Sequence, residues 1–130
     1  AETTRVIAIT QLTSTSPEAL KTEQLVDVPL VESVRNYAKL AQAAGLAGVV
    51  CSAHEAADIA SVTGPNFLRV TPGIRPAGSA VGDQSRVATP GNAASMGSSA
   101  IVVGRPITKA DDPVAAYHAI RDDWNAGRKA

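Results

Sequence analysis

Two glycine-rich segments that carry arginine could bind a phosphate group. The first is TPGIRPAGSAVGDQSR (71–86) and the second is VVGRPIT (102–108). Glycine lets the backbone approach a ligand closely, and a guanidinium such as that of Arg105 offers a fork of N–H donors to phosphate oxygens. Either segment alone is more often an ordinary turn with a solvated arginine. Their occurrence after two consecutive predicted strands favours a phosphate site.

The charge balance excludes several classes of partner. The 130 residues contain 12 Lys and Arg against 12 Asp and Glu, so there is no net field to attract nucleic acid or an anionic membrane. No apolar run approaches the roughly 18–20 residues of a membrane span. The N-terminal sequence lacks the basic region of a secretory signal. We therefore expect a cytoplasmic protein that binds neither nucleic acid nor membrane.

The few cysteine and histidine residues do not predict a metal site or a nucleophile. Cys51 is the only cysteine, which rules out an intrachain disulfide, and it lies inside an apolar run typical of a buried strand. His54 and His118 have no partners at the spacing that a metal site requires. We expect Cys51 to be a small buried side chain and the site to contain no metal.

The chain alternates between strand-like and helix-like segments. Apolar, β-branched runs predict strands at 5–12, 48–52, 67–71 and 99–103. Caps and helical spacing predict helices at 17–24, 30–44, 54–62, 90–96 and 113–125. Four βα units form either a small open parallel sheet or half of a (β/α)8 barrel. Length alone favours the open sheet, whereas the donor-rich ends of the last two strands favour the barrel, in which phosphate often binds there.

Several blocks of sequence resemble one enzyme family over nearly the whole chain. They are ITQLTS, YAKLAQAAGLAGVVCSAHE, TPGIRPAGSAVGDQSRVATP and VVGRPIT, followed by the pair Asp112-Pro113. Together they closely resemble the C-terminal half of orotidine 5′-phosphate decarboxylases of the bacterial type. The resemblance implies an α/β fold of four consecutive βα units, strands five to eight of a (β/α)8 TIM barrel. It also implies that residues 1–130 form a single partial domain from which the N-terminal half is absent.

The resemblance also implies ligand-binding roles for five residues. Thr13 matches the hydroxyl that meets the pyrimidine ring, although from sequence alone it is equally a helix-capping threonine. The residues that match ligands around the nucleotide, chiefly its 5′-phosphate, are Arg75, Gln84, Gly104 and Arg105. Gln84 would lie on a mobile loop that closes over the substrate and excludes water. The family mechanism uses neither a metal nor an organic cofactor.

The catalytic motif of the family is not found in this sequence. The chemistry depends on an Asp-x-Lys-x-x-Asp motif, in which an aspartate crowds the substrate carboxylate and the lysine protonates the carbanion after CO2 leaves. The four lysines are Lys21, Lys39, Lys109 and Lys129, and none has this spacing. Asp112, near Lys109, is better interpreted as a helix cap. We therefore assign no catalytic residue and expect the chain alone to be inactive.

Two functions remain in competition with that interpretation. One is a non-catalytic, self-associating half-barrel that binds phosphate esters, and the other is a decarboxylase-like relative that acts on a different sugar phosphate. A lone half-barrel exposes two strand edges and the apolar inner face of its sheet. The exposed sheet therefore predicts a protein partner, which is a second copy of the chain or a complementing N-terminal half. The small-molecule partners implied by the resemblance are the nucleotides OMP and UMP.

The last predicted helix has an apolar pattern that suggests an inner face. Its members are Val114, Tyr117, His118, Ile120 and Trp124. We expect Tyr117 and Trp124 to provide packing for this helix.

Overall fold

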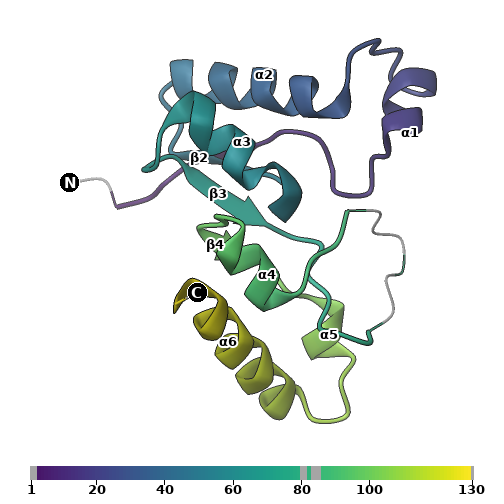
Figure 1. Ribbon diagram of the computed structural model, residues 1–130, viewed down its shortest axis with the longest axis vertical. Coiled ribbons are helices and arrows are strands. Elements are labelled where there is room, and N and C mark those ends of the chain that lie inside the picture. The colour runs from purple at the N-terminus through teal and green to yellow at the C-terminus, as the bar shows by residue number, and fades with distance from the viewer. Residues whose placement is uncertain (1–2, 80–81, 83–85, 130) are drawn as a thin grey trace.

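The chain forms a four-stranded parallel sheet with helices between the strands (Figure 1). The computed structural model describes residues 3–79, 82 and 86–129. The strands are β1 (Ile7–Ile9), β2 (Gly48–Val50), β3 (Leu68–Thr71) and β4 (Ala100–Ile101). They pair in the order β1-β2-β3-β4, and every pair is parallel. The predicted alternation of strands and helices is confirmed.

Several of the helices begin directly after a residue whose side chain caps the first turn. The helices are α1 (Pro17–Thr22), α2 (Leu30–Ala43), α3 (Ala53–Thr63), α4 (Pro90–Ser95), α5 (Arg105–Thr108) and α6 (Pro113–Lys129). The Ser16 hydroxyl accepts from the Ala19 amide at 3.1 Å, and the Thr89 hydroxyl accepts from the Asn92 amide at 3.2 Å. Asp112 Oδ1 accepts from the Ala115 amide at 3.0 Å, so its interpretation as a helix cap is correct.

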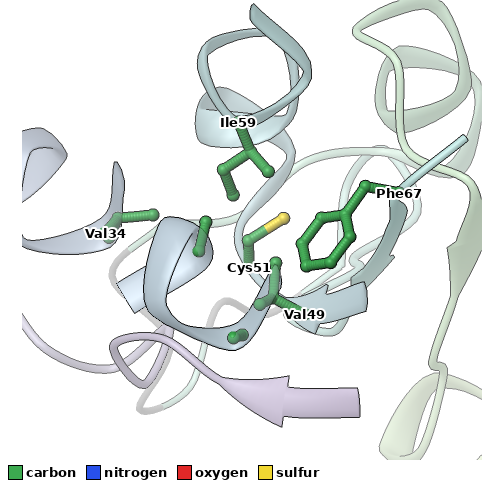
Figure 2. Packing of buried hydrophobic residues seen from close by; sticks show 7 residues of the cluster. Val34, Val49, Cys51, Ile59 and Phe67 are labelled. Atoms are coloured by element: carbon green, nitrogen blue, oxygen red, sulfur yellow. The ribbon is translucent and has the colours of Figure 1, made fainter. Parts of the chain in front are cut away.

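The two faces of the sheet differ in how well they are covered. The helix-covered face carries Ala8 and Val49, which pack with Val34 and Ala38 of α2. Figure 2 shows Val34 and Val49 beside Cys51 in this cluster. Side chains alternate along a strand, so the register places Ile9, Val50 and Val70 together on the opposite face. On that face the outer positions stay exposed, with Ile9 at 59% and Val102 at 52%. The core therefore lies between the sheet and its helices.

Helices α1 to α4 begin and end within two residues of their predicted limits, whereas strand β1 and the last two helices differ more. All four strands are shorter than the apolar runs suggested: β1 and β4 lose residues at both ends, β2 ends at Val50, and β3 begins at Leu68. The last helix runs to Lys129 instead of 125. The short helix α5 was not predicted, because GRPIT looks like a turn, yet the Gly104 carbonyl accepts from the amides of Ile107 and Thr108. Proline near the start of a helix fits this geometry.

Helix α6 packs against α4 more than against the sheet. A Cβ added at Gly127 would lie 2.1 Å from the Gly91 carbonyl oxygen, so the two helices meet at glycines. Asp123 Oδ2 accepts from the Gly91 amide at 2.9 Å and fixes this crossing. Because α6 lies in this way, the predicted inner face is only partly correct. Ile120 is buried and Trp124 packs against the core, whereas Val114, Tyr117 and His118 are exposed.

The Cys51 thiol is fully buried in the core, as predicted. Desolvation raises its pKa from 9.0 to about 11, although a hydrogen bond with Thr71 opposes the shift. Between these two pH values the folded chain retains the thiol proton and the unfolded chain loses it. Rising pH therefore favours the unfolded state in this window.

We expect this proton to make the free energy of unfolding fall by roughly 3 kcal/mol between pH 8 and pH 11.5, at 1.36 kcal/mol per pKa unit. The measurement is urea unfolding across that range for the wild-type chain and for Cys51→Ala. The two proteins differ at no other ionisable group, so the difference between the two pH slopes reports on the thiol. Equal slopes would contradict the prediction.

Candidate functional site

A cationic cleft lies at the carboxyl ends of β3 and β4. The described residues that line it are Arg75, Ser79, Gly82, Arg105, Pro106 and Lys109, and the cleft has a volume of about 310 Å³. It is bounded by the segment after β3 and by helix α5, which both lie at the carboxyl end of the sheet (Figure 1). Three of these residues are cations, and none of the described lining residues carries a carboxylate. This arrangement suits a phosphate dianion, which guanidinium and ammonium groups bind well.

Gly82 lets the backbone lie directly against Arg105. Its φ is +66°, a conformation that favours glycine, and an added Cβ would lie 3.3 Å from Arg105 Nη1. A larger residue would have to displace the guanidinium or strain the turn. Glycine at this position therefore keeps the turn and the Arg105 guanidinium in contact, whereas the predicted approach of the backbone to a ligand stays a prediction.

Arg75 is positioned by the base of the segment that follows β3. Its amide donates to the Ala88 carbonyl at 2.9 Å, and the Ala88 amide donates to the Gly73 carbonyl at 3.3 Å. The neighbouring Ile74 is fully buried, and Arg75 Nη1 donates to the Ile74 carbonyl at 2.7 Å. The hydrogen-bonded backbone of Arg75 and the buried side chain of Ile74 together fix the position from which the Arg75 side chain extends.

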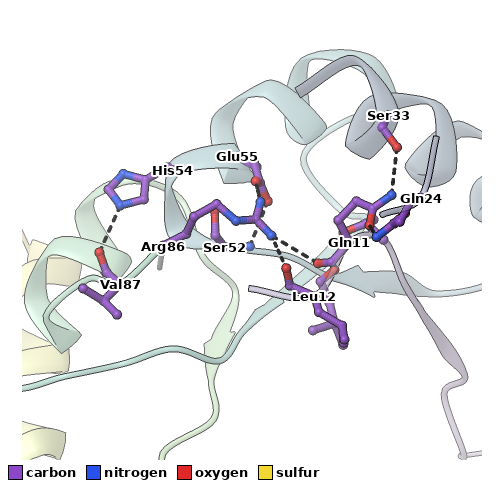
Figure 3. A network of polar contacts seen from close by, with 11 residues as sticks. Gln11, Leu12, Gln24, Ser33, Ser52, His54, Glu55, Arg86 and Val87 are labelled. Carbon is purple, nitrogen blue, oxygen red and sulfur yellow. Dashed lines mark hydrogen bonds and ion pairs between the residues drawn. The ribbon is translucent and has the colours of Figure 1, made fainter. Parts of the chain in front are cut away.

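A second polar cluster joins the end of this segment to the turns after β1 and β2 (Figure 3). The Arg86 guanidinium forms an ion pair with Glu55 in the first turn of α3, and both side chains are nearly buried, 11% and 7% exposed. Arg86 Nη2 also donates to the carbonyls of Leu12 at 2.5 Å and Gln11 at 3.4 Å. Burial lowers the pKa of Arg86 from its ordinary value. Even so, guanidinium stays protonated in proteins.

The five predicted ligand-binding residues lie in different parts of this region. Arg75 and Arg105 line the same cleft, and Gly104 is the N-cap of α5. Thr13 is buried in the turn after β1, outside the described lining of the cleft, and its carbonyl accepts from the Arg86 amide at 3.3 Å. Gln84 lies outside the described residues. The ligand contacts of all five stay predictions.

Sequence reasoning missed two members of the cleft and the ion pair beside it. Lys109 follows Arg105 by four residues, the spacing that places two side chains on one face of a helical turn. That signal was available only if α5 had been recognised. Ser79 carries no such signal. Arg86 and Glu55 are 31 positions apart, and no local pattern connects them.

No group of three or more His, Cys, Asp or Glu side chains in the described part of the chain could hold a metal ion. Among the helices of residues 3–79, 82 and 86–129, none is long and apolar enough to cross a bilayer.

Comparison with known proteins finds one family. Residues 1–120 match the model of the orotidine 5′-phosphate decarboxylase / HUMPS family. An orotidine 5′-phosphate decarboxylase from Streptococcus uberis is 60% identical over 121 residues, which are 93% of this chain and 53% of that protein. The corresponding Streptococcus mutans protein is 57% identical over 121 residues, again 53% of its length. The chain thus spans about half the length of the curated relatives it matches.

Solved structures agree with the sequence comparison. Orotidine 5′-phosphate decarboxylase from Lactobacillus acidophilus matches with a TM-score of 0.77 and 47% identity over 94% of this chain and 50% of its own. The decarboxylase from Pyrococcus horikoshii OT3, at 21% identity and a TM-score of 0.66 over 51% of its chain, supports the fold alone. The predicted half-barrel of four βα units is confirmed. The chain belongs to the orotidine 5′-phosphate decarboxylase / HUMPS family.

Proposed function

We propose that this chain is the phosphate- and pyrimidine-binding half of an orotidine 5′-phosphate decarboxylase, which converts OMP to UMP and CO2. The observation that carries the proposal is the cleft containing Arg75, Arg105 and Lys109 at the carboxyl ends of β3 and β4. In (β/α)8 barrels the ends of the last two strands often hold the substrate phosphate. The names of the relatives from Streptococcus uberis and Lactobacillus acidophilus support the choice of reaction.

Each part of the cleft has a definite role in this proposal. The guanidinium groups of Arg75 and Arg105 donate to the phosphate oxygens, and Lys109 contributes a compact positive charge. Thr13 contacts the pyrimidine ring from the turn after β1, and Gln84 and Gly104 complete the nucleotide site. Contacts to the phosphate are remote from the carboxylate that leaves. Their binding energy accelerates the reaction only if it is used to organise the site around the ring.

The groups that break the C–C bond come, in this proposal, from the other half of the barrel. No Asp-x-Lys-x-x-Asp motif occurs in the 130 residues. We accordingly propose that this chain binds nucleotide and that decarboxylation requires a complementing half. Residues 1–130 are then a single partial domain.

The uncovered face of the sheet supports the need for a partner. Ile9 and Val102 are more than half exposed on the face away from the helices, and β1 and β4 are the outer strands of the sheet. Apolar side chains and unpaired strand edges of this kind favour association. The same observation supports the second candidate function, a self-associating half-barrel that binds phosphate esters without catalysis.

Calorimetry and a decarboxylation assay separate these functions. We expect the chain to bind UMP without consuming OMP, and to gain turnover when mixed with the N-terminal half of the Streptococcus uberis relative. Binding of UMP and of ribose 5-phosphate with equal affinity, together with a dimer that the added half does not dissociate, would favour the second function. Turnover by the chain alone would overturn the proposed division between binding and chemistry.

A further inference from the structure

Arg86 connects three consecutive strand ends that are distant in sequence. Its ion pair with Glu55 reaches the start of α3, directly after β2. Its hydrogen bonds to Gln11 and Leu12 reach the turn after β1, and Arg86 itself ends the segment after β3. Figure 3 shows the guanidinium between Glu55 and the carbonyls of this turn. One side chain thus joins the turn that carries Thr13 to the segment that carries Arg75.

The geometry of these contacts requires a planar guanidinium. Nη1 faces the Glu55 carboxylate while Nη2 faces two backbone carbonyls, and a guanidinium presents its donors in a fixed fork. The other Glu55 oxygen accepts from the Ser52 amide at 3.0 Å, so the carboxylate is itself held in place. An ammonium group could keep the ion pair but could not reproduce the fork.

The turn after β1 is also held from its other side. Gln11 Nε2 donates to the Ser33 hydroxyl at 3.1 Å, and Gln11 Oε1 accepts from Gln24 Nε2 at 3.1 Å. The Thr10 hydroxyl donates to the Val50 carbonyl at 2.7 Å. With helix α2 and strand β2 fixing these side chains, Arg86 supplies the link toward the phosphate cleft.

We propose that Arg86 is a positioning residue that fixes the Thr13 turn relative to the phosphate cleft, so that one nucleotide can contact both. The proposal rests on the proposed function, because it deepens how that site distinguishes a nucleotide from a bare sugar phosphate. Arg86 is not one of the described residues that line the phosphate cleft. It acts through the backbone carbonyls of Gln11 and Leu12 and through its own amide, which donates to Thr13.

The discriminating variant is Arg86→Lys, which keeps the charge opposite Glu55 and loses the fork. Its matched control is Arg35→Lys, because Arg35 pairs with Asp58 on the half-exposed surface of α2 and α3, away from both turns. Circular dichroism first establishes that both variants are folded. A second variant, Glu55→Leu with Arg86→Met, removes the charges together and keeps the test available if the lysine variant unfolds.

The first readout is amide hydrogen exchange of the ligand-free chain. The Thr15 amide donates to Leu12 at 2.9 Å, and the Arg86 amide donates to Thr13, so both report on the linked turn. We expect their exchange to accelerate roughly tenfold in Arg86→Lys, the equivalent of about 1.4 kcal/mol of local stability, and to be unchanged in Arg35→Lys. Unchanged exchange in Arg86→Lys would overturn the proposal whether or not nucleotide binds.

The second readout compares the Kd of UMP with that of ribose 5-phosphate. We expect Arg86→Lys to weaken UMP binding roughly tenfold and ribose 5-phosphate binding less than about twofold, because only the ring contact is misplaced. Equal weakening of both ligands would show a purely structural role and overturn the proposal. A wild-type chain that binds no UMP would overturn the proposed function instead, and the link between the turns would still be decided by the exchange rates.

Discussion

Arg105→Ala is expected to weaken UMP binding by roughly 10- to 100-fold, the loss of about 1.5–3 kcal/mol that a hydrogen bond to a charged group contributes. Arg105 lines the cationic cleft with Arg75 and Lys109, and the backbone at Gly82 lies against its guanidinium. Without Arg105, the described lining of the cleft keeps one guanidinium group, that of Arg75. Calorimetric titration with UMP, and with inorganic phosphate, measures the effect.

Two further variants give this result its meaning. Arg105→Lys keeps the positive charge and loses the bidentate geometry, so we expect a smaller loss than in Arg105→Ala. Arg121→Ala is the control, since Arg121 is exposed on α6, paired with Asp122 at 2.8 Å and outside the described lining of the cleft. A phosphate site elsewhere in the molecule would be indicated if Arg105→Ala and Arg121→Ala bound UMP equally well. If the loss of UMP affinity in Arg105→Ala is larger at low salt and absent at high salt, Arg105 acts only through a diffuse charge effect.

The sequence was sufficient to predict the parallel sheet because its information is local. The caps Ser16 and Thr89 and the apolar runs at 48–52 and 67–71 each act within a few residues. Parallel neighbours then follow from the alternation of strands with helices, which leaves few topologies. The two donor-rich strand ends, with Arg105 in the second, were predicted for the same reason, since consecutive strand ends meet at one edge of such a sheet. The role of Arg75 was implied only by the resemblance to the family.

The features that the sequence did not predict depend on tertiary contacts. Helix α5 is a single turn whose sequence is equally that of a loop, so Lys109 could not be placed beside Arg105. The exposed side chains of α6 were misassigned because the close approach of Gly91 and Gly127 sets the orientation of that helix, and periodicity alone does not reveal it. The partnership of Arg86 with Glu55 requires the folded sheet to exist before the two residues meet.

Glu55→Ala should destabilise the fold more than any loss of a surface ion pair. It leaves the Arg86 guanidinium nearly buried with no carboxylate opposite, and removal of one partner of a buried pair costs about 3–5 kcal/mol. It also removes the acceptor for the Ser52 amide at the start of α3. The free energy of unfolding of a typical domain is about 5–15 kcal/mol, so this loss should lower Tm by about 10–20 °C.

The control for burial is Asp58→Ala, which removes the partner of Arg35 from a pair whose side chains are more than a third exposed. Exposed pairs contribute about 0–1 kcal/mol, so Tm should change by only a few degrees. Thermal unfolding followed by circular dichroism compares the two variants at one protein concentration. If they lose equal stability, solvent reaches Arg86 freely and the pair is not buried in solution.

If Glu55→Leu combined with Arg86→Met regains much of the lost stability, the cost in Glu55→Ala came from the unpaired charge, because an apolar pair of similar volume can replace a buried ion pair. The ion pair would then be retained for what it positions and not for the stability it adds.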